Sequence, residues 1–333
     1  MYETRKTPIL RRSARWLLAA VFALSLCWQQ AWASPAEEKT VIPLGKAVGI
    51  KLFADGVLVV GLAENGDCPA RQCGLREGDI ITAMDGQRIS STEQVQEMLQ
   101  ATAGEPLALS VHRGQRTLSM TACPVQTDDG TWQLGAWIRD SMAGIGTLTY
   151  YDPATGQYGA LGHGITDVDT AQLMPLSSGS IMETAVKAVK KGVKGDFSVQ
   201  RDVGTVTVNS DGGIFGTVMD ADFLSGGTPV PVASPSQVKT GRATILATVH
   251  GDDTAEYTVD IVRVYGDGAA TRNMLLHITD QRLLDTTGGI VQGMSGSPIL
   301  QDGRIVGAVT HVLLNDPTRG YGIFLENMLS MAG

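Results

Sequence analysis

Cysteine is scarce in this chain, with only 4 in 333 residues. So few cysteines cannot form the disulfide framework that stabilises a small secreted scaffold. None of them has the paired Cys-x-x-Cys spacing that is typical of structural zinc sites, and no nucleotide-binding motif is present. The sequence therefore predicts an activity that needs no metal or other cofactor.

Basic residues are also in short supply, because 26 Lys and Arg stand against 34 Asp and Glu, a net charge of −8. A nucleic-acid-binding surface needs an excess of Lys and Arg that can replace counterions on phosphates. We therefore expect no nucleic-acid partner. With 43% hydrophobic and 18% charged residues, the composition is that of a soluble globular protein of about two domains.

Long apolar runs are missing as well. The apolar run near the N-terminus, Trp16–Trp28, has 13 residues, whereas a membrane-spanning helix needs about 20. Five basic residues precede the run, and Ala31-Trp32-Ala33 places small residues where signal peptidase cuts. We predict a signal peptide over residues 1–33, cleaved after Ala33, and an exported protein; an uncleaved N-terminal anchor is the alternative.

Removal of residues 1–33 takes away five basic residues and one acidic residue. The remaining chain then has 21 Lys and Arg against 33 Asp and Glu, a net charge of −12. Three cysteines stay in it, Cys68, Cys73 and Cys123. A disulfide between Cys68 and Cys73 and three reduced thiols are both compatible with this spacing.

Glycine is abundant, with 40 residues against 13 prolines and no collagen-like period, which indicates many turns between short strands. After a linker over 34–45, the segment 46–124 predicts strands at 57–61 and 78–84, the second ending in the Asp85-Gly86 turn. A helix follows, with Ser90 and Glu93 as its capping box. A hairpin over 107–112 and 115–120 completes this domain.

The segment 46–124 resembles a PDZ domain of the bacterial protease type. The resemblance rests on Gly74–Ile81 (GLREGDII) and on Met84-Asp85-Gly86. PDZ domains add an extended peptide to a sheet edge and hold a C-terminal carboxylate with loop amides, so C-terminal or internal peptides are the implied partners. The implied peptide-binding segment is Val48, Gly49, Ile50, Lys51 and Leu52. A PDZ fold that packs on its neighbour and binds no free C-terminus is the alternative.

The region 131–333 consists of short apolar runs separated by Gly-rich turns. This pattern predicts an all-β sandwich or barrel. One short helix is expected, over 181–191.

A candidate nucleophile lies in the hexapeptide Gly293–Pro298 (GMSGSP). A serine between glycines can sit on a sharp turn that exposes its hydroxyl, while the amides of Gly293 and Ser295 form an oxyanion hole. The motif alone could also be an ordinary glycine turn. It resembles the G-D-S-G-G-P nucleophile motif of chymotrypsin-like peptidases, from which Met294 and Ser297 depart. The resemblance makes 303–311 and 319–324 walls of the specificity pocket.

A serine nucleophile needs a base and an acid that orients the base. Among five histidines, His163 is the best candidate base because glycines flank it, and His311 is the second choice. Asp280, 15 residues before Ser295, is the chosen acid. The usual order in chymotrypsin-like enzymes favours Asp220 or Asp222 instead.

Three longer motifs resemble the stage IV sporulation protein B family of PDZ-containing serine peptidases. They are GALGHGITD (159–167), GIVQGMSGSPI (289–299) and GAVTHVLLNDPTRGYGI (307–323). The resemblance implies a chymotrypsin-like double β-barrel and a triad in the order His163, Asp280, Ser295, which favours Asp280 over Asp220.

The same resemblance implies a biological role. Such an enzyme is exported into the space between the two forespore membranes and cleaves itself. It then cuts the extracytoplasmic part of a membrane-bound regulator, which releases an intramembrane protease and activates a late sporulation sigma factor. Two alternatives remain: a PDZ adaptor with an inactive barrel that regulates a membrane protease by binding, and a general quality-control protease.

Overall fold

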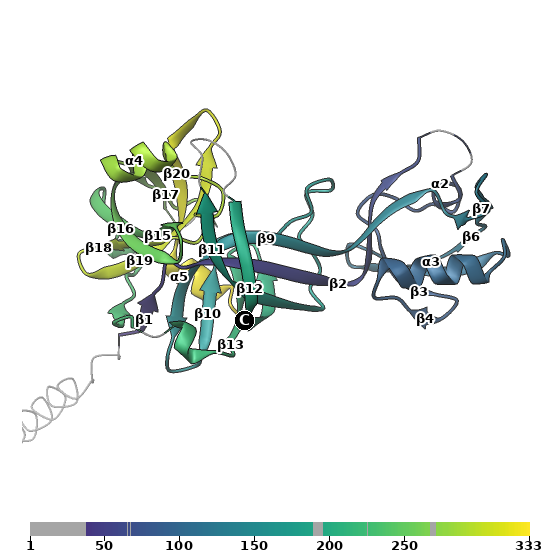
Figure 1. Cartoon of the computed structure of the whole chain (residues 1–333), viewed down its shortest axis with the longest axis horizontal. Coiled ribbons are helices and arrows are strands. Elements are labelled where there is room, and N and C mark those ends of the chain that lie inside the picture. The colour runs from purple at the N-terminus through teal and green to yellow at the C-terminus, as the bar shows by residue number, and fades with distance from the viewer. Residues whose placement is uncertain (1–37, 65, 67, 189–195, 225, 267–270) are drawn as a thin grey trace, which may run out of the picture. The chain divides into compact units, whose positions relative to one another are not determined.

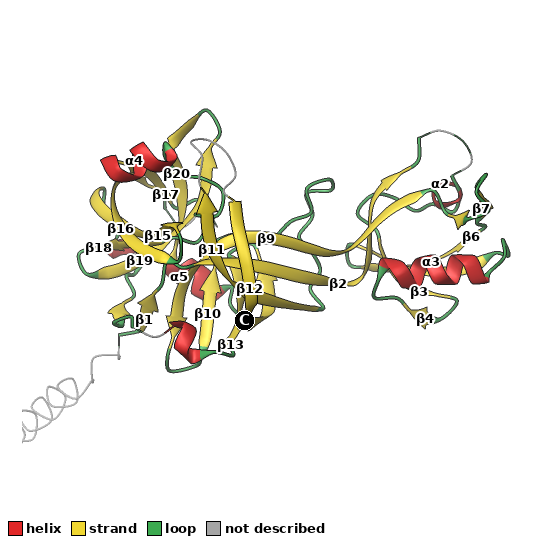
Figure 2. Cartoon of the chain, in the orientation of Figure 1, coloured by secondary structure: helices red, strands yellow, loops and turns green. Residues whose placement is uncertain are grey.

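The computed structural model describes residues 38–64, 66, 68–188, 196–224, 226–266 and 271–333. The predicted signal peptide, residues 1–33, lies outside the described residues. Strands dominate the described chain and helices are few and short (Figure 2). The prediction of a mainly β protein is therefore confirmed.

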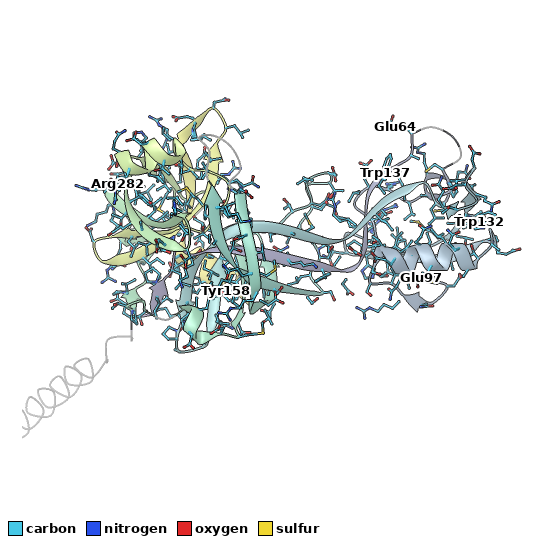
Figure 3. All side chains as sticks on the ribbon, viewed as in Figure 1. Glu64, Glu97, Trp132, Trp137, Tyr158 and Arg282 are labelled. Atoms are coloured by element: carbon cyan, nitrogen blue, oxygen red, sulfur yellow. The ribbon has the colours of Figure 1, made fainter. Side chains whose placement is uncertain are left out.

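Six strands close into a first barrel because β9 pairs with both β10 and β2. Its strands, in ring order, are β2 (Ala47–Leu62), β9 (Ala136–Asp152), β10 (Gln157–Ala160), β13 (Gly213–Val218), β12 (Asp196–Ser210) and β11 (Ser178–Ala188). Two short strands, β1 (Thr40–Pro43) and β14 (Val230–Pro231), extend this sheet beyond β9. Its core contains the fully buried Tyr158 (Figure 3).

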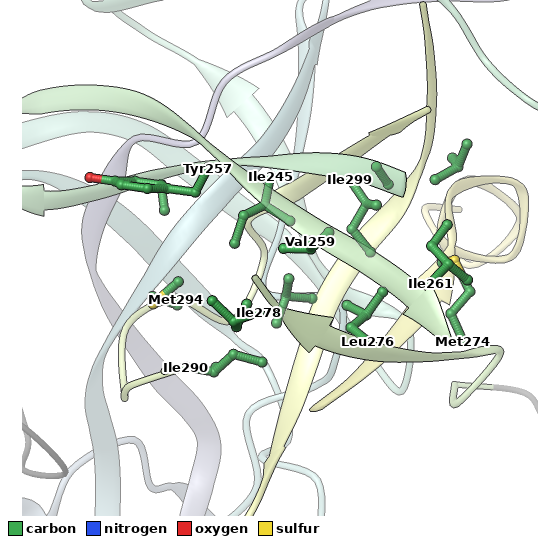
Figure 4. Close-up of a cluster of buried hydrophobic side chains, with 14 of the residues drawn as sticks. Ile245, Tyr257, Val259, Ile261, Met274, Leu276, Ile278, Ile290, Met294 and Ile299 are labelled. Atoms are coloured by element: carbon green, nitrogen blue, oxygen red, sulfur yellow. The ribbon is translucent and has the colours of Figure 1, made fainter. Parts of the chain in front are cut away.

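A second closed barrel follows in the chain (Figure 1). Its strands, in ring order, are β15 (Gly241–His250), β16 (Asp253–Val264), β17 (Met274–Ile278), β20 (Asp316–Phe324), β19 (Arg304–Leu313) and β18 (Pro298–Gln301). Alternating apolar side chains fill its interior (Figure 4). The helices α4 (Gln281–Thr287) and α5 (Leu325–Ser330) and the 3-10 turn η2 (Pro235–Gln237) complete this half. The 3-10 turn η1 (Ala221–Leu224) instead buries Phe223 and Leu224 in the core of the first barrel.

The PDZ domain lies in the chain between β2 and β9. Its elements are α2 (Pro69–Gln72), β3 (Ile80–Met84), β4 (Gln87–Arg88), α3 (Thr92–Ala101), β5 (Leu107–Arg113), β6 (Arg116–Ala122), β7 (Val125–Gln126) and β8 (Trp132–Gln133). The expected helix and hairpin are both present. The helix cap is Ser91, one residue later than predicted, because its side chain accepts the hydrogen bond from the amide of Gln94.

The PDZ domain is an insertion into the first barrel. The first half of β2, Ala47–Phe53, pairs with residues 141–147 of β9, and the second half, from Leu58, pairs with Ala136–Arg139. The chain therefore leaves the barrel along β2 and returns along β9. The predicted boundary at residue 46 and the predicted linker over 34–45 are corrected accordingly, because residues 40–43 are a strand that extends the barrel sheet and residues 47–53 belong to a barrel strand.

The expected helix over 181–191 is a strand as far as the structure describes it. Residues 178–188 form β11, which pairs with β2 and β12, and residues 189–191 lie outside the described part. Ile181, Thr184 and Val186 are buried, and pairing on both sides outweighs their short helical pattern.

The three described cysteines are free thiols, so no bridge joins Cys68 to Cys73. The Cys68 thiol donates to the carbonyl of Gly135 at 3.2 Å, and burial raises the pKa of the Cys73 thiol. Within the described residues, no helix has both the length and the apolarity to cross a membrane. No cluster of potential metal ligands is found there either.

Candidate active site

His163 lies on a tight turn that follows β10. Leu161 and Gly162 both have left-handed backbone angles, with φ of +70° and +68°. A Cβ atom at Gly162 would lie 3.0 Å from Cγ2 of Thr310, which belongs to the second barrel. A Cβ atom at Gly164 would overlap Leu173. The flanking glycines thus let the histidine turn approach its neighbours closely, as their presence in the sequence predicts.

The hydrogen bonding of His163 fixes its tautomer. Its Nδ1 lies 2.9 Å from the carbonyl oxygen of Gly164. A carbonyl can only accept, so Nδ1 carries the proton and Nε2 keeps a lone pair. Burial lowers the pKa of His163, and the Gly164 hydrogen bond opposes this shift only in part. The ring is therefore neutral at pH 7 and presents a basic nitrogen.

Ser295 lies on a turn between β17 and β18 that two glycines make possible. Gly293 and Gly296 have φ of +104° and +98°, and a Cβ atom at Gly296 would overlap the carbonyl oxygen of Thr147. Met294 is 2% exposed and packs into the second barrel (Figure 4). The methionine that departs from the chymotrypsin-like motif therefore anchors the turn by apolar burial.

The amides of Gly293 and Ser295 donate no hydrogen bond within the described residues. Their carbonyl groups, in contrast, are both occupied by Thr147. Two unpaired amides beside a serine hydroxyl are what an oxyanion hole requires. The hydroxyl of Ser295 itself donates to the carbonyl of Thr310 at 2.7 Å.

His163 and Ser295 line one pocket of about 640 Å³. The remaining wall is mostly apolar and comes from both sides of the serine turn, with Ile290, Val291, Val312, Leu313, Leu314 and Tyr321. An adjoining pocket of about 610 Å³ shares His163, Arg272, Gln292 and His311. The histidine therefore lies where two pockets meet, and the serine opens into one of them.

His311 is the second histidine of the site. Its ring centroid lies 5.0 Å from that of His163, and both rings line both pockets. Loss of hydration, together with the charges of His163 and Arg272, lowers the pKa of His311 to about 4. Part of the residue is nevertheless exposed to solvent. At neutral pH the two histidines therefore do not repel each other.

The structure does not bring Asp280 to this pocket. Asp280 is the N-cap of α4, where its carboxylate accepts from the Arg282 amide at 3.0 Å and from its guanidinium at 2.8 Å. It also accepts from the amide of Thr258. The predicted role of Asp280 as orienting acid is corrected here, since its acceptor positions are filled by groups other than His163.

Neither alternative acid lines the pocket with His163. Asp220 binds the guanidinium of Arg201 on β12, and Asp222 lies in the 3-10 turn η1. Among the described residues, no carboxylate hydrogen-bonds to His163; the Gly164 carbonyl occupies the position at Nδ1. The site is thus a Ser–His pair whose histidine is oriented by the backbone.

The predicted peptide-binding segment, Val48–Leu52, is also corrected. On one side it pairs with residues 142–146 of β9, and on the other with residues 179–183 of β11. Val48, Ile50 and Leu52 point into the barrel core. A strand that has partners on both sides cannot accept a third, so this segment is closed to added peptides.

A free strand edge of the PDZ domain lies elsewhere, on the first half of β9. Within the described chain, Ala136–Arg139 pairs with β2 on one edge and with no strand on the other. The preceding turn has Gly135 at φ +72°, and the amides of Leu134 and Gly135 donate to no described group. Such amides suit a peptide carboxylate.

Helix α3 runs beside this edge and is tied to it at both ends. The amide of Thr92 donates to Asp140 at 2.8 Å, and the Gln100 side chain bonds the backbone of Trp132 at 3.0 and 3.2 Å. Sequence reasoning missed the edge because Leu134–Ile138 (LGAWI) comes after the PDZ motifs. The sequence signal that could have identified this edge is a glycine followed by apolar residues.

Two closed barrels that bring a serine and a histidine into one pocket, with a PDZ domain inserted into the first, define a PDZ-containing serine peptidase of chymotrypsin-like architecture. The model of the SpoIVB peptidase S55 family matches residues 130–329, and that of the PDZ domain matches residues 64–113. The chain belongs to the SpoIVB peptidase S55 family.

Similarity to individual proteins covers smaller parts of the chain. A Clostridium perfringens protein named as a zinc metalloprotease is 31% identical over 90 residues, which are 25% of this chain and 27% of that protein. A Synechocystis sp. protein named as the serine protease HhoB is 39% identical over 70 residues, 21% and 16% of the two chains. This chain therefore spans about a quarter or less of the length of these relatives.

Solved structures are similar at low identity. The PDZ domain of an SdrC-like protein from Listeria monocytogenes is 23% identical, covers 25% of this chain and 87% of that one, and has a TM-score of 0.23. The active form of the Rv3671c protease from M. tuberculosis is 16% identical, covers 57% and 73%, and has a TM-score of 0.33.

Proposed function

We propose that this protein is a serine endopeptidase. Ser295 Oγ attacks a peptide carbonyl while Nε2 of His163 takes its proton, and the same nitrogen returns the proton to the leaving amine. Water then cleaves the acyl-enzyme by the same route. The observation that carries the proposal is that His163, in the tautomer a base requires, and Ser295 line one pocket.

The first step requires a rotation of the serine. In the structure the Ser295 hydroxyl donates to the carbonyl of Thr310, and it must turn from there toward His163. The loss of one neutral hydrogen bond costs about 1 kcal/mol. A bound peptide that displaces the hydroxyl from Thr310 would offset this cost.

The apolar pocket wall favours an apolar side chain before the scissile bond. Val291, Leu313 and Tyr321 line the pocket beside the serine, and Arg272 is its one residue that is charged at neutral pH. Burying a Leu or Phe side chain there contributes about 1.5–3 kcal/mol. A basic side chain would lose its hydration there without gaining a counter-charge, because the charged residue of the wall is Arg272.

The physiological substrates we propose are the protein itself and the extracytoplasmic part of a membrane-bound regulator of an intramembrane protease. Cleavage of that regulator would trigger intramembrane proteolysis and activation of a late sigma factor during sporulation, in the space between the forespore membranes. Membership of the SpoIVB peptidase S55 family and the export pattern of residues 1–33 support this assignment.

A matched pair of variants tests the nucleophile. Ser295→Ala should abolish peptide cleavage and labelling by a serine-directed phosphonate. Ser297→Ala is the control, because Ser297 lies in the same turn and is fully buried, and its hydroxyl has no hydrogen-bond partner among the described residues. It should react at the wild-type rate. A wild-type protein that does not label would instead indicate a PDZ adaptor with an inactive barrel.

Self-cleavage is tested with the inactive variant as substrate. Wild-type protein should cut added Ser295→Ala protein. N-terminal sequencing of the fragments locates each cut in the chain, and the residue that precedes each cut should be apolar. An unfolded protein such as casein serves as the comparison substrate. Equally rapid, unselective degradation of casein would favour a quality-control protease.

A second activity, peptide binding by the PDZ domain, is supported by the free edge of β9. We propose that an extended peptide pairs with Ala136–Arg139 while the amides of Leu134 and Gly135 hold its carboxylate. Trp137 lies in this edge segment and Trp132 lies shortly before it in the chain; they are the only tryptophans after residue 33 (Figure 3). Tryptophan fluorescence of the Ser295→Ala protein therefore reports binding.

The control for peptide binding is the same peptide with a C-terminal amide. The free acid should change the fluorescence at lower concentration than the amide does. Equal affinities would show that the amides of Leu134 and Gly135 hold no carboxylate. No change with either peptide would indicate a PDZ fold that binds no free C-terminus.

A further inference from the structure

Thr147 on β9 binds both the turn that carries Ser295 and the turn that precedes His163, although it belongs to neither catalytic motif. Its side-chain hydroxyl donates to the carbonyl of Gly293 at 2.6 Å, and its amide donates to the carbonyl of Ser295 at 2.9 Å. Its carbonyl accepts from the amide of Leu161, on the turn before His163, at 3.2 Å. The residue is 2% exposed.

These bonds fix the peptide groups 293–294 and 295–296, which lie on either side of the group 294–295 that carries the Ser295 amide; group 293–294 also adjoins the group that carries the Gly293 amide. The carbonyl groups of Gly293 and Ser295 both accept hydrogen bonds from Thr147, whereas the amides of the same two residues donate to no group in the described chain. Gly293 has φ of +104° and no side chain to restrict it, so its orientation depends on what its carbonyl binds. A carbonyl turned toward the pocket would repel the developing oxyanion.

We propose that Thr147 is a positioning residue for peptide cleavage, which holds the oxyanion-binding amides of Gly293 and Ser295 in place from a strand of the other barrel. This inference rests on the proposed peptidase function. The side-chain hydroxyl is what makes threonine necessary at this position. The backbone amide of any residue could bind the Ser295 carbonyl, but only a side-chain donor reaches the carbonyl of Gly293. Buried and hydrogen-bonded, it holds that carbonyl without competition from water.

Thr149 provides a matched control two residues along the same strand. Its hydroxyl donates to the carbonyl of Gly296 at 2.8 Å, and it is as deeply buried as Thr147. That carbonyl shares its peptide group with the amide of Ser297, which is bonded to the carbonyl of Met294 and is not an oxyanion donor. Replacement of either threonine by valine removes the same kind of buried bond, but only one of these bonds orients the oxyanion amides.

The experiment compares wild-type, Thr147→Val, Thr147→Ser and Thr149→Val proteins in phosphonate labelling rate, kcat, KM and Tm, at a temperature where all are folded. We expect Thr147→Val to lower kcat and the labelling rate about 100-fold, as for loss of one oxyanion donor, with KM within about twofold. Thr147→Ser keeps the hydroxyl and should remain within about fivefold of the wild type.

Thr149→Val should lose as much Tm as Thr147→Val and yet stay within about fivefold of the wild-type labelling rate. The inference is overturned if Thr147→Val labels at the wild-type rate, if Thr149→Val loses as much rate, or if Thr147→Ser is as slow as Thr147→Val. A wild-type protein that does not label overturns the proposed function, and this inference with it.

Discussion

The pKa of His163 sets the pH range in which the pair can work. Burial lowers this pKa, and the Gly164 carbonyl, a neutral group, stabilises the charged ring less than a carboxylate would. The other titratable or charged side chains that line its pockets, apart from Ser295, are His311, Arg272, Asp211 and Tyr321. The neutral, basic form of His163 therefore persists below the ordinary histidine pKa.

The pH profile of cleavage should follow this pKa. As the pH falls, kcat/KM should decline only below about pH 6.5, the pKa of an unperturbed histidine. The same midpoint should appear when His163 is titrated by NMR in the Ser295→Ala protein. A midpoint at or above pH 6.5 would mean that a carboxylate reaches the ring in solution.

Replacement of Gly162 distinguishes the effect of backbone strain on stability from the effect of a displaced His163 turn on cleavage. An alanine there must adopt the left-handed conformation at a cost of about 1–2 kcal/mol, and its Cβ would press on Thr310. Gly156, at φ +74° with open space around it, is the control. Thermal unfolding should show both Gly→Ala variants destabilised, whereas cleavage should be lost only in Gly162→Ala. Equal activity of the two would contradict the crowding argument.

His163, Ser295 and the two oxyanion amides could be chosen from sequence because glycines mark the turns that place them. Asp280 could not be assigned in the same way. A carboxylate near the end of a strand can orient a histidine or cap the next helix, and local spacing is the same in both cases. The cap dominates because Arg282 and the amide of Thr258 lie within reach of its oxygens.

At the scale of elements, α4 depends on that cap. Asp280→Ala should lower the free energy of unfolding by about 0.5–2 kcal/mol, the usual value of an N-cap. The Arg282 side chain and other hydrogen bonds hold the pKa of Asp280 at about 2, below its ordinary 3.8. Its contribution is thus complete above about pH 4 and is lost as the pH falls through 2.

Chemical denaturation of wild-type and Asp280→Ala proteins at pH 7 and at pH 2 measures this contribution. The difference between the two proteins should shrink at the lower pH. Cleavage by the Asp280→Asn protein well below its Tm is the decisive control. If the Asp280→Asn protein has wild-type stability but no activity, the cap assignment is contradicted and Asp280 acts as the acid of a catalytic triad.

Pairing between distant strands explains why the predicted peptide-binding segment, Val48–Leu52, was wrong. Val48–Leu52 has the apolar pattern of a PDZ strand, but its partners lie far along the chain, at residues 142–146 of β9 and 179–183 of β11. Sequence motifs near residue 78 could identify the PDZ domain correctly. They could not show which strand of the preceding chain pairs with the barrel, because that pairing is not local.

For the molecule as a whole, the insertion of the PDZ domain predicts where the chain can be cut. Phe53 and Ser141 are directly paired neighbours on β2 and β9. Replacement of residues 54–140 by Asn-Gly should therefore close a two-residue hairpin and leave the peptidase barrels folded and reactive with phosphonate. Because Arg139 and its ion pair with the buried Asp167 are lost, we expect a Tm below that of the wild type.

The matched deletion follows the boundaries expected from sequence. Removal of residues 46–124 would take away the barrel strand Ala47–Phe53 and open the first barrel. That protein should fail to unfold cooperatively in calorimetry. Two deletions that behave alike would contradict the shared-strand architecture.

The shared strands also give the protein an order of assembly. During synthesis, β2 leaves the ribosome long before β9, and Phe53 is separated from Ser141 by 88 positions of chain. A PDZ domain that folds first holds these two positions together, which shortens the effective loop to a few residues. Because closure entropy depends on the logarithm of loop length, this removes about 3 kcal/mol from the cost of closing the barrel. An inserted domain that folds first would thus make closure of the first barrel easier, and with it the placement of β9, the strand that carries Thr147.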